Sequence, residues 1–199
     1  MQLKIRRAQE SDAKSIQEIY APVVVNTATS FEIVPPSESQ MQQRIANISG
    51  TYPWLVCEQE GEVYGYAYAS THRDRPAYQW SIDVSVYVNQ KARRTGIGRA
   101  LYTSLFAILV QQGYYNAFAG ITLPNAGSVG LHESLGFRPI ALYKNVGFKL
   151  GKWHDVGWWQ LPLQSPAEFP ETPINICAMK DSTAFQTAIE KGLATLKRT

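Results

Sequence analysis

The stretch "VYVNQKARRTGIGRALY", Val86 to Tyr102, decides the fold. An alternating apolar run ends in a basic turn with two glycines, and a run with helical spacing follows. Unpaired N–H groups and the positive dipole end make a helix start attractive to anions, and glycines let the backbone approach a ligand closely. The residues of the turn are Arg93, Arg94, Thr95, Gly96, Ile97, Gly98 and Arg99. The stretch therefore predicts a strand, a turn and a helix that together bind a diphosphate.

The residues around the glycines narrow the kind of diphosphate. A P-loop ends in Lys followed by Ser or Thr, and no such pair follows this turn. A dinucleotide-binding turn has a third glycine, but Leu101 occupies that place. It also has an acidic residue about 20 positions further on at a strand end, and none fits well here. The motif therefore favours neither nucleoside triphosphates nor dinucleotides.

The composition describes a globular chain of 199 residues, with 45% hydrophobic residues and a net charge of +3. This length suits one well-cored domain with an extra terminal element. The net charge is too small to predict nucleic-acid binding. No apolar run reaches the ~18 residues that a membrane-spanning helix needs, and the N-terminus does not resemble a signal peptide. We therefore expect neither a nucleic-acid partner nor a membrane partner.

The cysteines indicate the expected compartment, and together with the histidines they indicate whether a metal site is expected. Cys57 and Cys177 are the only cysteines, and two cysteines do not make a disulfide framework. A reducing cytoplasm is therefore the expected location. His72, His132 and His154 show no paired spacing with each other or with the cysteines. We therefore expect no metal site.

Hydrophobic periodicity and turn residues predict the order of the elements. Alternation predicts strands over 3–8, 77–89, 116–122, 138–150 and 153–161, and a hairpin over 52–72 with its turn at Glu60-Gly61. Helical spacing predicts helices over 11–24, 37–49, 99–112, 125–136 and 181–198. The early hairpin and the late antiparallel strands predict an α/β (α+β) fold with a mixed sheet.

The composition changes after Leu163. Residues 162–173 hold four prolines, and this density predicts a linker. The amphipathic helix expected over 181–198 could pack on this chain or on a partner, and the sequence leaves both open. We therefore divide the chain into a domain over 1–163 and a tail over 164–199.

Several blocks of the sequence carry a family resemblance. The run from Arg93 to Gly98 resembles the R/Q-x-x-G-x-G/A signature of the GNAT superfamily of acyl-CoA N-acyltransferases, whose loop binds the pyrophosphate of coenzyme A. The block "NAGSVGLHESLGF" is similar to a second element of that superfamily. The blocks "TSFE", "YQWSIDVSVYV" and "KWHDVGWWQL" resemble its phosphinothricin N-acetyltransferase branch. The resemblance covers residues 2 to 163 and implies a central mixed, mostly antiparallel sheet flanked by helices.

The resemblance implies acetyl-CoA as the cosubstrate and assigns residues to it. The pyrophosphate would lie on the turn from Arg93 to Arg99. The pantetheine arm and the thioester would be held by the backbone of Val86, Tyr87 and Val88 and by Asn125 and Ser128. The residues themselves give no independent reason for Asn125, which could equally cap its helix.

The resemblance also implies two catalytic residues. The branch carries a Glu, as the base that deprotonates the amine, on the strand before "VYV", and this sequence has Asp83 there. Aspartate has the same charge but a shorter reach, so a water relay or a plain solvated carboxylate are the alternatives. His132 stands where many members have a Tyr that protonates the coenzyme A thiolate. A histidine can donate a proton too, although a lone histidine on a helix is more often structural.

The acceptor is the least constrained part of the function. The resemblance implies the α-amine of a small amino-acid-like substrate, with L-phosphinothricin, methionine sulfoximine and methionine sulfone as candidates. Its implied contacts are Phe31, Glu32, Arg75 and Tyr78. A different acceptor, such as a polyamine, a drug or a protein N-terminus, is one alternative, and a non-catalytic acyl-CoA-binding module is another. The resemblance further implies a homodimer.

Overall fold

The computed structural model describes residues 3–179 and 181–196, and the strands of this part form a seven-stranded sheet in the order β1-β2-β3-β4-β5-β7-β6. The strands are β1 (Lys4–Arg7), β2 (Trp54–Gln59), β3 (Glu62–Thr71), β4 (Ser81–Val88), β5 (Asn116–Leu123), β6 (Arg138–Lys149) and β7 (Lys152–Pro162). The α-helices are α1 (Ala13–Asn26), α2 (Glu38–Ser49), α3 (Ile97–Gln112), α4 (Ala126–Ser134) and α5 (Thr183–Leu193). The 3₁₀ helices are η1 (Glu10–Asp12), η2 (Pro76–Tyr78), η3 (Gln90–Ala92) and η4 (Ile176–Ala178). This mixed, mostly antiparallel sheet with flanking helices confirms the predicted fold class.

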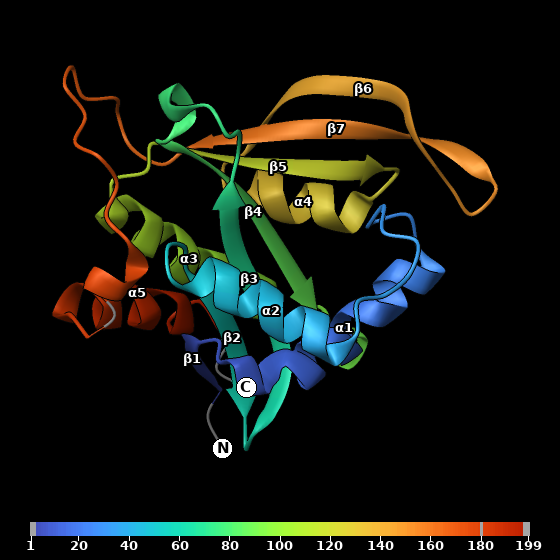
Figure 1. Cartoon of the computed structure of the whole chain (residues 1–199), viewed down its shortest axis with the longest axis horizontal. Helices are drawn as coiled ribbons and strands as arrows, with labels where there is room; N and C mark the ends of the chain where they lie inside the picture. The colour runs from blue at the N-terminus through green and yellow to red at the C-terminus, as the bar shows by residue number, and fades with distance from the viewer. Residues whose placement is uncertain (1–2, 180, 197–199) are drawn as a thin grey trace.

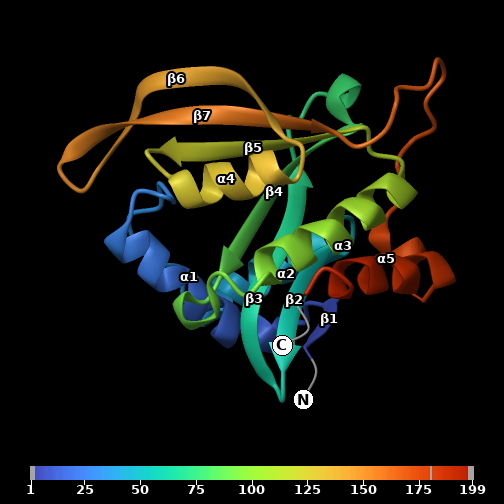
Figure 2. The same ribbon diagram turned by 180° about the vertical axis from the view of Figure 1, so that it is seen from behind.

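The helices cover both faces of the sheet. Helices α1 and α2 lie on the face turned toward the viewer in Figure 1, and α3 and α5 lie on the other face, which Figure 2 shows from behind. Each layer has its own apolar cluster. Ile16 and Met41 pack with Tyr66 on the first face, and Leu101 and Leu105 pack with Ile82 on the second. Burial of these side chains is the main stabilising contribution to the two layers.

The sheet opens between β4 and β5, the only parallel pair among the described strands. Their pairing runs from Ser81↔Asn116 to Asp83↔Phe118 and ends there, although β4 continues to Val88 and β5 to Leu123. Figure 1 shows the two strands diverging beyond this point. Beyond Asp83, the edge of β4 that faces β5 therefore has no strand partner in the described part of the chain. A backbone edge of this kind can accept an extended ligand as a further strand.

Helix α3 begins at Ile97, so the predicted start at Arg99 is two residues late. The residue before it, Gly96, has φ +94°, a left-handed conformation that glycine adopts without steric cost. Ile97 and Ala100 of this first turn are buried in the core, but the glycines on either side of Ile97 interrupt the apolar pattern that would mark the helix start in the sequence. The helix ends as predicted, with Gly113 at φ +95°.

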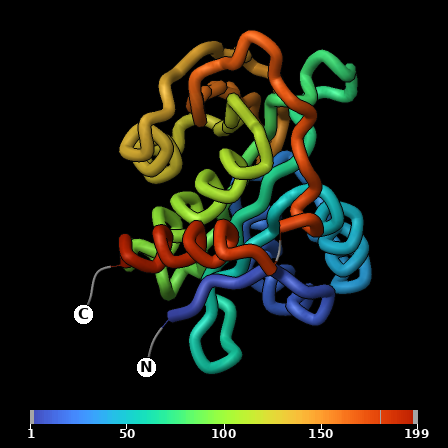
Figure 3. The backbone as a smooth tube through the Cα atoms, turned by 90° about the vertical axis from the view of Figure 1, so that its left-hand side faces the viewer, coloured from blue at the N-terminus to red at the C-terminus, as the bar shows by residue number. Residues whose placement is uncertain are grey.

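The tail packs on this chain, which settles the choice that the sequence left open. Ile176 is fully buried in the same cluster as α3, and α5 runs beside α3, as Figure 3 shows. Gly192 sits so close to the backbone of Ala100 and to Ser104 that a Cβ atom would clash there. Helix α5 ends at Leu193, earlier than predicted, and residues 197–198 of the predicted helix lie outside the described residues.

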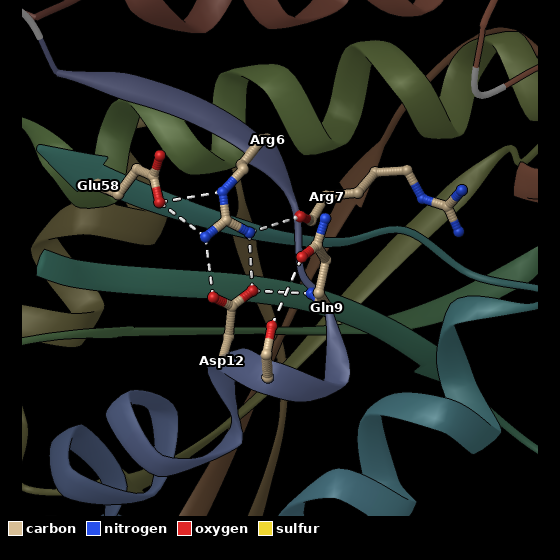
Figure 4. Close-up of polar contacts among 6 residues, drawn as sticks. Arg6, Arg7, Gln9, Asp12 and Glu58 are labelled. Carbon is tan, nitrogen blue, oxygen red and sulfur yellow. Dashed lines mark hydrogen bonds and ion pairs between the residues drawn. The ribbon is translucent and has the colours of Figure 1, made fainter. Parts of the chain in front are cut away.

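The guanidinium of Arg6 joins β1, η1 and β2 through a network shown in Figure 4. It donates to both carboxylate oxygens of Asp12, over 2.7 and 2.8 Å, and to Glu58. The backbone N–H of Gln9 donates to the Asp12 carboxylate over 2.7 Å. Asp12 thus uses its side chain for this network instead of capping α1.

Among residues 3–179 and 181–196, no helix is both long and apolar enough to cross a bilayer. No group of three or more His, Cys, Asp or Glu side chains in this part could hold a metal ion. Cys57 is a buried free thiol, and Cys177 is an exposed one.

Candidate active site

A pocket lies in the opening between β4 and β5, and it brings together five of the residues predicted to form the site. Its walls come from both strands, from α3, from the first turns of α4 and from the loop after α1. The lining residues are Thr29, Val84, Ser85, Val86, Tyr87, Tyr102, Ala119, Gly120, Ile121, Thr122, Asn125, Ser128 and His132. Four of the five predicted pantetheine residues therefore share one cavity with His132, whereas Val88 and the predicted base Asp83 are not among its lining residues.

The glycine turn lies at the end of β4 and has the geometry of an anion site. Gly96 at φ +94° starts α3, and the N–H groups of the first helical turn have no intrahelical partner. Arg94 has φ +66°, a left-handed conformation uncommon for a non-glycine residue. The hydroxyl of Thr95 donates to the carbonyl of Ala92 over 2.7 Å and fixes the turn from within. These residues could hold an anion such as a diphosphate.

The arginines of the turn play different parts. Arg99 donates to the hydroxyl of Ser134 over 2.8 Å, so its charge is directed at the end of α4. Arg93 and Arg94 make no side-chain hydrogen bond or ion pair with any residue in the described ranges. The structure therefore leaves two guanidinium groups available for a ligand at the turn, while Arg99 is already used within the chain.

Asn125 and Ser128 lie in the pocket at the start of α4. The side-chain oxygen of Asn125 accepts the backbone N–H of Ser128 over 3.1 Å, which makes Asn125 the cap of α4. The alternative role stated for this residue is therefore present in the structure. Its amide NH₂ remains able to donate into the pocket.

His132 is buried, and both of its ring nitrogens have partners. Nδ1 donates to the carbonyl of Ser128 over 2.8 Å, so Nε2, 3.1 Å from the hydroxyl of Tyr102, accepts in the neutral ring. Burial lowers the pKa of His132, and the hydrogen bond to Ser128 opposes only part of that effect. The side chain is therefore a neutral imidazole near pH 7, and it meets the pocket beside Tyr102.

Asp83 lies at the last pair of the β4–β5 ladder, where the strands part. Its carboxylate oxygen Oδ1 is 2.6 Å from Nδ1 of His72. Burial raises the pKa of the Asp83 carboxyl, and the hydrogen bond and charge of His72 act in the opposite direction. A carboxylate with a raised pKa is a stronger base than one in water.

The loop between α1 and α2 carries Glu32 and Phe31. Arg44 holds the Glu32 carboxylate with two hydrogen bonds of 2.8 and 2.9 Å, which lower its pKa, and the hydroxyl of Tyr20 donates to it as well. The buried ammonium group of Lys149 donates to the carbonyl of Ser30 over 2.7 Å. These contacts fix the loop, so Glu32 is engaged within the chain.

Arg75 and Tyr78 lie at η2, just before the start of β4. The ring of Tyr78 meets that of His72 edge-on, with centroids 6.0 Å apart. The side chain of Arg75 is exposed and forms no hydrogen bond or ion pair with a residue in the described part of the chain. No hydrogen bond or ring contact in that part joins Arg75 or Tyr78 to Phe31 or Glu32, so the predicted acceptor contacts form two separate groups.

Residues 5–158 match the family described as the acetyltransferase (GNAT) domain. The chain belongs to the GNAT acetyltransferase family. It is 36% identical over 172 residues to phosphinothricin N-acetyltransferase of Streptomyces viridochromogenes, covering 86% of this chain and 93% of that protein. It is 34% identical to an L-methionine sulfoximine/L-methionine sulfone acetyltransferase of Salmonella typhimurium, over 83% of this chain and 97% of that protein.

A solved structure gives the same result at the level of the fold. The phosphinothricin acetyltransferase from Sinorhizobium meliloti in complex with AcCoA superposes on this GNAT acetyltransferase with a TM-score of 0.79 and 38% identity, covering 85% of this chain and 96% of that one. These comparisons confirm the predicted family, the predicted fold and the predicted class of enzyme, an acetyl-CoA-dependent N-acetyltransferase.

The sequence did not predict two residues at the site of this GNAT acetyltransferase, Tyr102 beside His132 and His72 beside Asp83. His72 follows β3, two residues beyond Ser70, which pairs with Asp83 in the β3–β4 ladder. Residues two apart on a strand share a face, so His72 and Asp83 are diagonal neighbours. The sequence therefore held a signal for the contact between His72 and Asp83, but recognising it required the register between β3 and β4.

Proposed function

We propose that this acetyltransferase transfers the acetyl group of acetyl-CoA to the α-amine of a small amino-acid-like acceptor. L-phosphinothricin, methionine sulfoximine and methionine sulfone are the candidate acceptors. The observation that carries the proposal is the position of Asp83. A carboxylate with a raised pKa stands where β4 and β5 part, next to the open backbone edge of β4. The acceptors named for the relatives support the choice of amine.

The cosubstrate would be held along its whole length by neighbouring elements. The pantetheine arm would lie as an added strand on the backbone of Val86, Tyr87 and Val88. Asn125 and Ser128 would bind it from the start of α4. The pyrophosphate would lie on the turn from Arg93 to Arg99, where the helix start and the positive charges of Arg93 and Arg94 favour an anion.

The chemistry is direct transfer between the two substrates. Asp83 supplies the negative charge that draws a proton from the acceptor ammonium, directly or through a neighbouring group. The freed amine nitrogen then forms a bond to the thioester carbonyl carbon, and the carbon–sulfur bond breaks. We assign His132 to the side of the leaving thiolate. Because its Nε2 accepts the hydrogen of the Tyr102 hydroxyl, His132 would order this hydroxyl on the pocket wall, and the thiolate would take up the second proton that the attacking nitrogen loses.

The acceptor would be held from both sides of the opening. Arg75 supplies an exposed positive charge for the acceptor carboxylate, and Tyr78 lies beside the His72 ring. Phe31 and Glu32 would close the other side from the loop after α1. In this arrangement Glu32 shapes the loop through Arg44 and meets the acceptor with its remaining lone pairs.

A coenzyme A release assay tests the proposed acceptor class. The panel contains the three amino-acid analogues, a polyamine, an aminoglycoside and an N-terminal peptide. We expect turnover with the amino-acid analogues, and a loss of about 10²- to 10⁴-fold in kcat for Asp83→Asn, the range for a general base. Turnover confined to the other amines would contradict the acceptor class. Binding of acetyl-CoA without turnover by the wild type or by Asp83→Glu would favour a non-catalytic acyl-CoA-binding module.

We also propose that the protein is a cytoplasmic homodimer. Strand β6 is an edge of the sheet, and the β6–β7 hairpin exposes large apolar side chains. Apolar surface beside an open edge strand favours association. The two free cysteines suit a reducing compartment.

A further inference from the structure

His72 and Asp83 form an Asp–His pair at the point where β4 and β5 diverge. Nδ1 of His72 is 2.6 Å from Oδ1 of Asp83, and only 11% of the His72 side chain is exposed. We propose that His72 is the group that accepts the proton of the attacking amine, and that Asp83 acts through it as a positioning residue. This inference rests on the proposed function and names the acceptor of the proton within it.

The hydrogen bond fixes which nitrogen of His72 can act as a base. An ionised carboxylate can only accept a hydrogen bond, so the hydrogen of this bond belongs to Nδ1. The neutral ring then carries its unshared electron pair on Nε2. Nε2 has no hydrogen-bond partner among residues 3–179 and 181–196. A base whose acceptor atom is not used within the chain is suited to take a proton from a substrate.

Aromatic rings hold the His72 imidazole in one orientation. The ring of Phe118 on β5 stacks on it, with centroids 4.2 Å apart and 14° between the planes. Tyr78 from η2 and Trp158 from β7 meet it edge-on at 6.0 and 6.2 Å. The charged or titratable groups facing the pair are Tyr78, Tyr68 on β3 beside Asp83, and Arg73, whose guanidinium lies 5.9 Å from the Trp158 ring. The packing therefore orients the ring and leaves Nε2 as its reactive position.

The His72–Asp83 pair also compensates for the shorter side chain of aspartate. Asp83 lacks one methylene relative to the glutamate that the resemblance implies at this position. The imidazole, hydrogen-bonded to the carboxylate, extends the basic atom beyond Oδ1 by the width of a ring. A carboxylate that fixes the tautomer of a histidine and stabilises its charged form is an established arrangement for a general base.

The proton balance is complete without another reactant. The acceptor ammonium gives one proton to Nε2 and becomes a neutral amine, which forms the carbon–nitrogen bond as the carbon–sulfur bond breaks. The nitrogen loses a second proton in this step, and the thiolate takes up one proton to become the free thiol. Imidazolium at His72 returns its proton to solvent, so one proton is released per turnover.

The test is the pH profile of kcat/KM for the wild type, His72→Gln and His72→Phe, with the acceptor that the coenzyme A release assay identifies. His72→Phe is the matched variant that keeps a ring against Phe118 and removes both nitrogens. We expect both variants to lose about 10²- to 10⁴-fold in kcat with KM for acetyl-CoA unchanged. The acid limb of the wild-type profile should disappear in both variants, because the titrating base is gone.

Three results would overturn the inference. Wild-type kcat and an unchanged acid limb in either variant would exclude His72 as the base. In ¹⁵N-histidine NMR of the wild type, a neutral His72 protonated on Nε2 would exclude it without any use of activity, even if the variants fail to fold. An inactive wild type would overturn the proposed function and this inference together, whereas an active wild type with an equally active His72→Gln overturns only the inference.

Discussion

At Asp12, a single buried carboxylate connects β1 to the start of α1. Burial alone would raise the pKa of Asp12, but the hydrogen bonds from Arg6 and from the Gln9 N–H outweigh it and lower the pKa. A lowered folded-state pKa stabilises the fold above the unfolded value of about 3.9, and this contribution is lost as pH falls through the folded value. Asp12→Asn should therefore cost about 1.5–3 kcal/mol of the free energy of unfolding at pH 7.

Urea unfolding followed at several pH values measures this cost. The difference between wild type and Asp12→Asn should stay constant above about pH 5 and narrow below the unfolded pKa. Glu10→Gln is the matched control, because it neutralises an exposed carboxylate two residues away in η1. A difference that does not change with pH would show that the loss comes from packing and not from the ion pair.

The residues of the site differ in how far sequence could predict them. Asp83 and His132 were assigned from a motif, and the structure adds their partners, His72 and Tyr102. Each of these contacts joins residues that are distant along the chain or lie on different elements. Periodicity reports which face a side chain occupies, but not the register that selects its neighbour. The pairs that set the protonation of the site therefore needed the folded chain.

The unit formed by β4, the glycine turn and α3 was the most predictable element. The alternation of β4 and the stripe of α3 are local patterns, and both strand and helix formed as expected. The start of α3 and the place of α5 were less predictable, for different reasons. The start of α3 depends on one left-handed glycine, Gly96. The place of α5 depends on the close approach of Gly192 to α3, which no spacing within α5 reveals.

Gly96 tests whether the turn binds the cosubstrate. Gly96→Ala places a Cβ on a backbone with φ +94°, where an L-residue pays about 1–2 kcal/mol of strain. The expected relaxation moves the N–H groups of the turn and weakens acetyl-CoA binding by about tenfold, which corresponds to 1.4 kcal/mol.

Isothermal titration calorimetry measures the Kd of acetyl-CoA for Gly96→Ala and for the wild type. Gly130→Ala, at an exposed position of α4 with no neighbour within 4 Å, is the control and should leave the Kd unchanged. A lowered Tm with an unchanged Kd for Gly96→Ala would show that the turn contributes to stability and not to acetyl-CoA binding.

At the scale of the whole molecule, the β6–β7 hairpin carries an exposed apolar surface that a partner could cover. Phe148 and Trp153 are cross-strand neighbours near its turn, 58% and 60% exposed, with ring centroids 5.5 Å apart. Ile140, Leu142 and Val146 extend this exposed apolar surface along β6. In Figure 1 the hairpin reaches beyond the helices that cover the rest of the sheet. A second copy of the chain would bury this surface and protect the edge strand.

The double variant Phe148→Lys/Trp153→Lys should therefore convert a dimer into a monomer. Sedimentation velocity of the wild type should give twice the 22.3 kDa mass of the chain, and the double variant should give that mass alone. Loss of paired aromatic contacts of at least about 2 kcal/mol weakens association by about 30-fold or more. Phe169→Lys is the control, because Phe169 is even more exposed, at 84%, but lies in the tail between β7 and η4. A wild type that sediments as a monomer at all concentrations would contradict the dimer. A dimer that persists in the double variant would show that the interface lies on another face of the molecule.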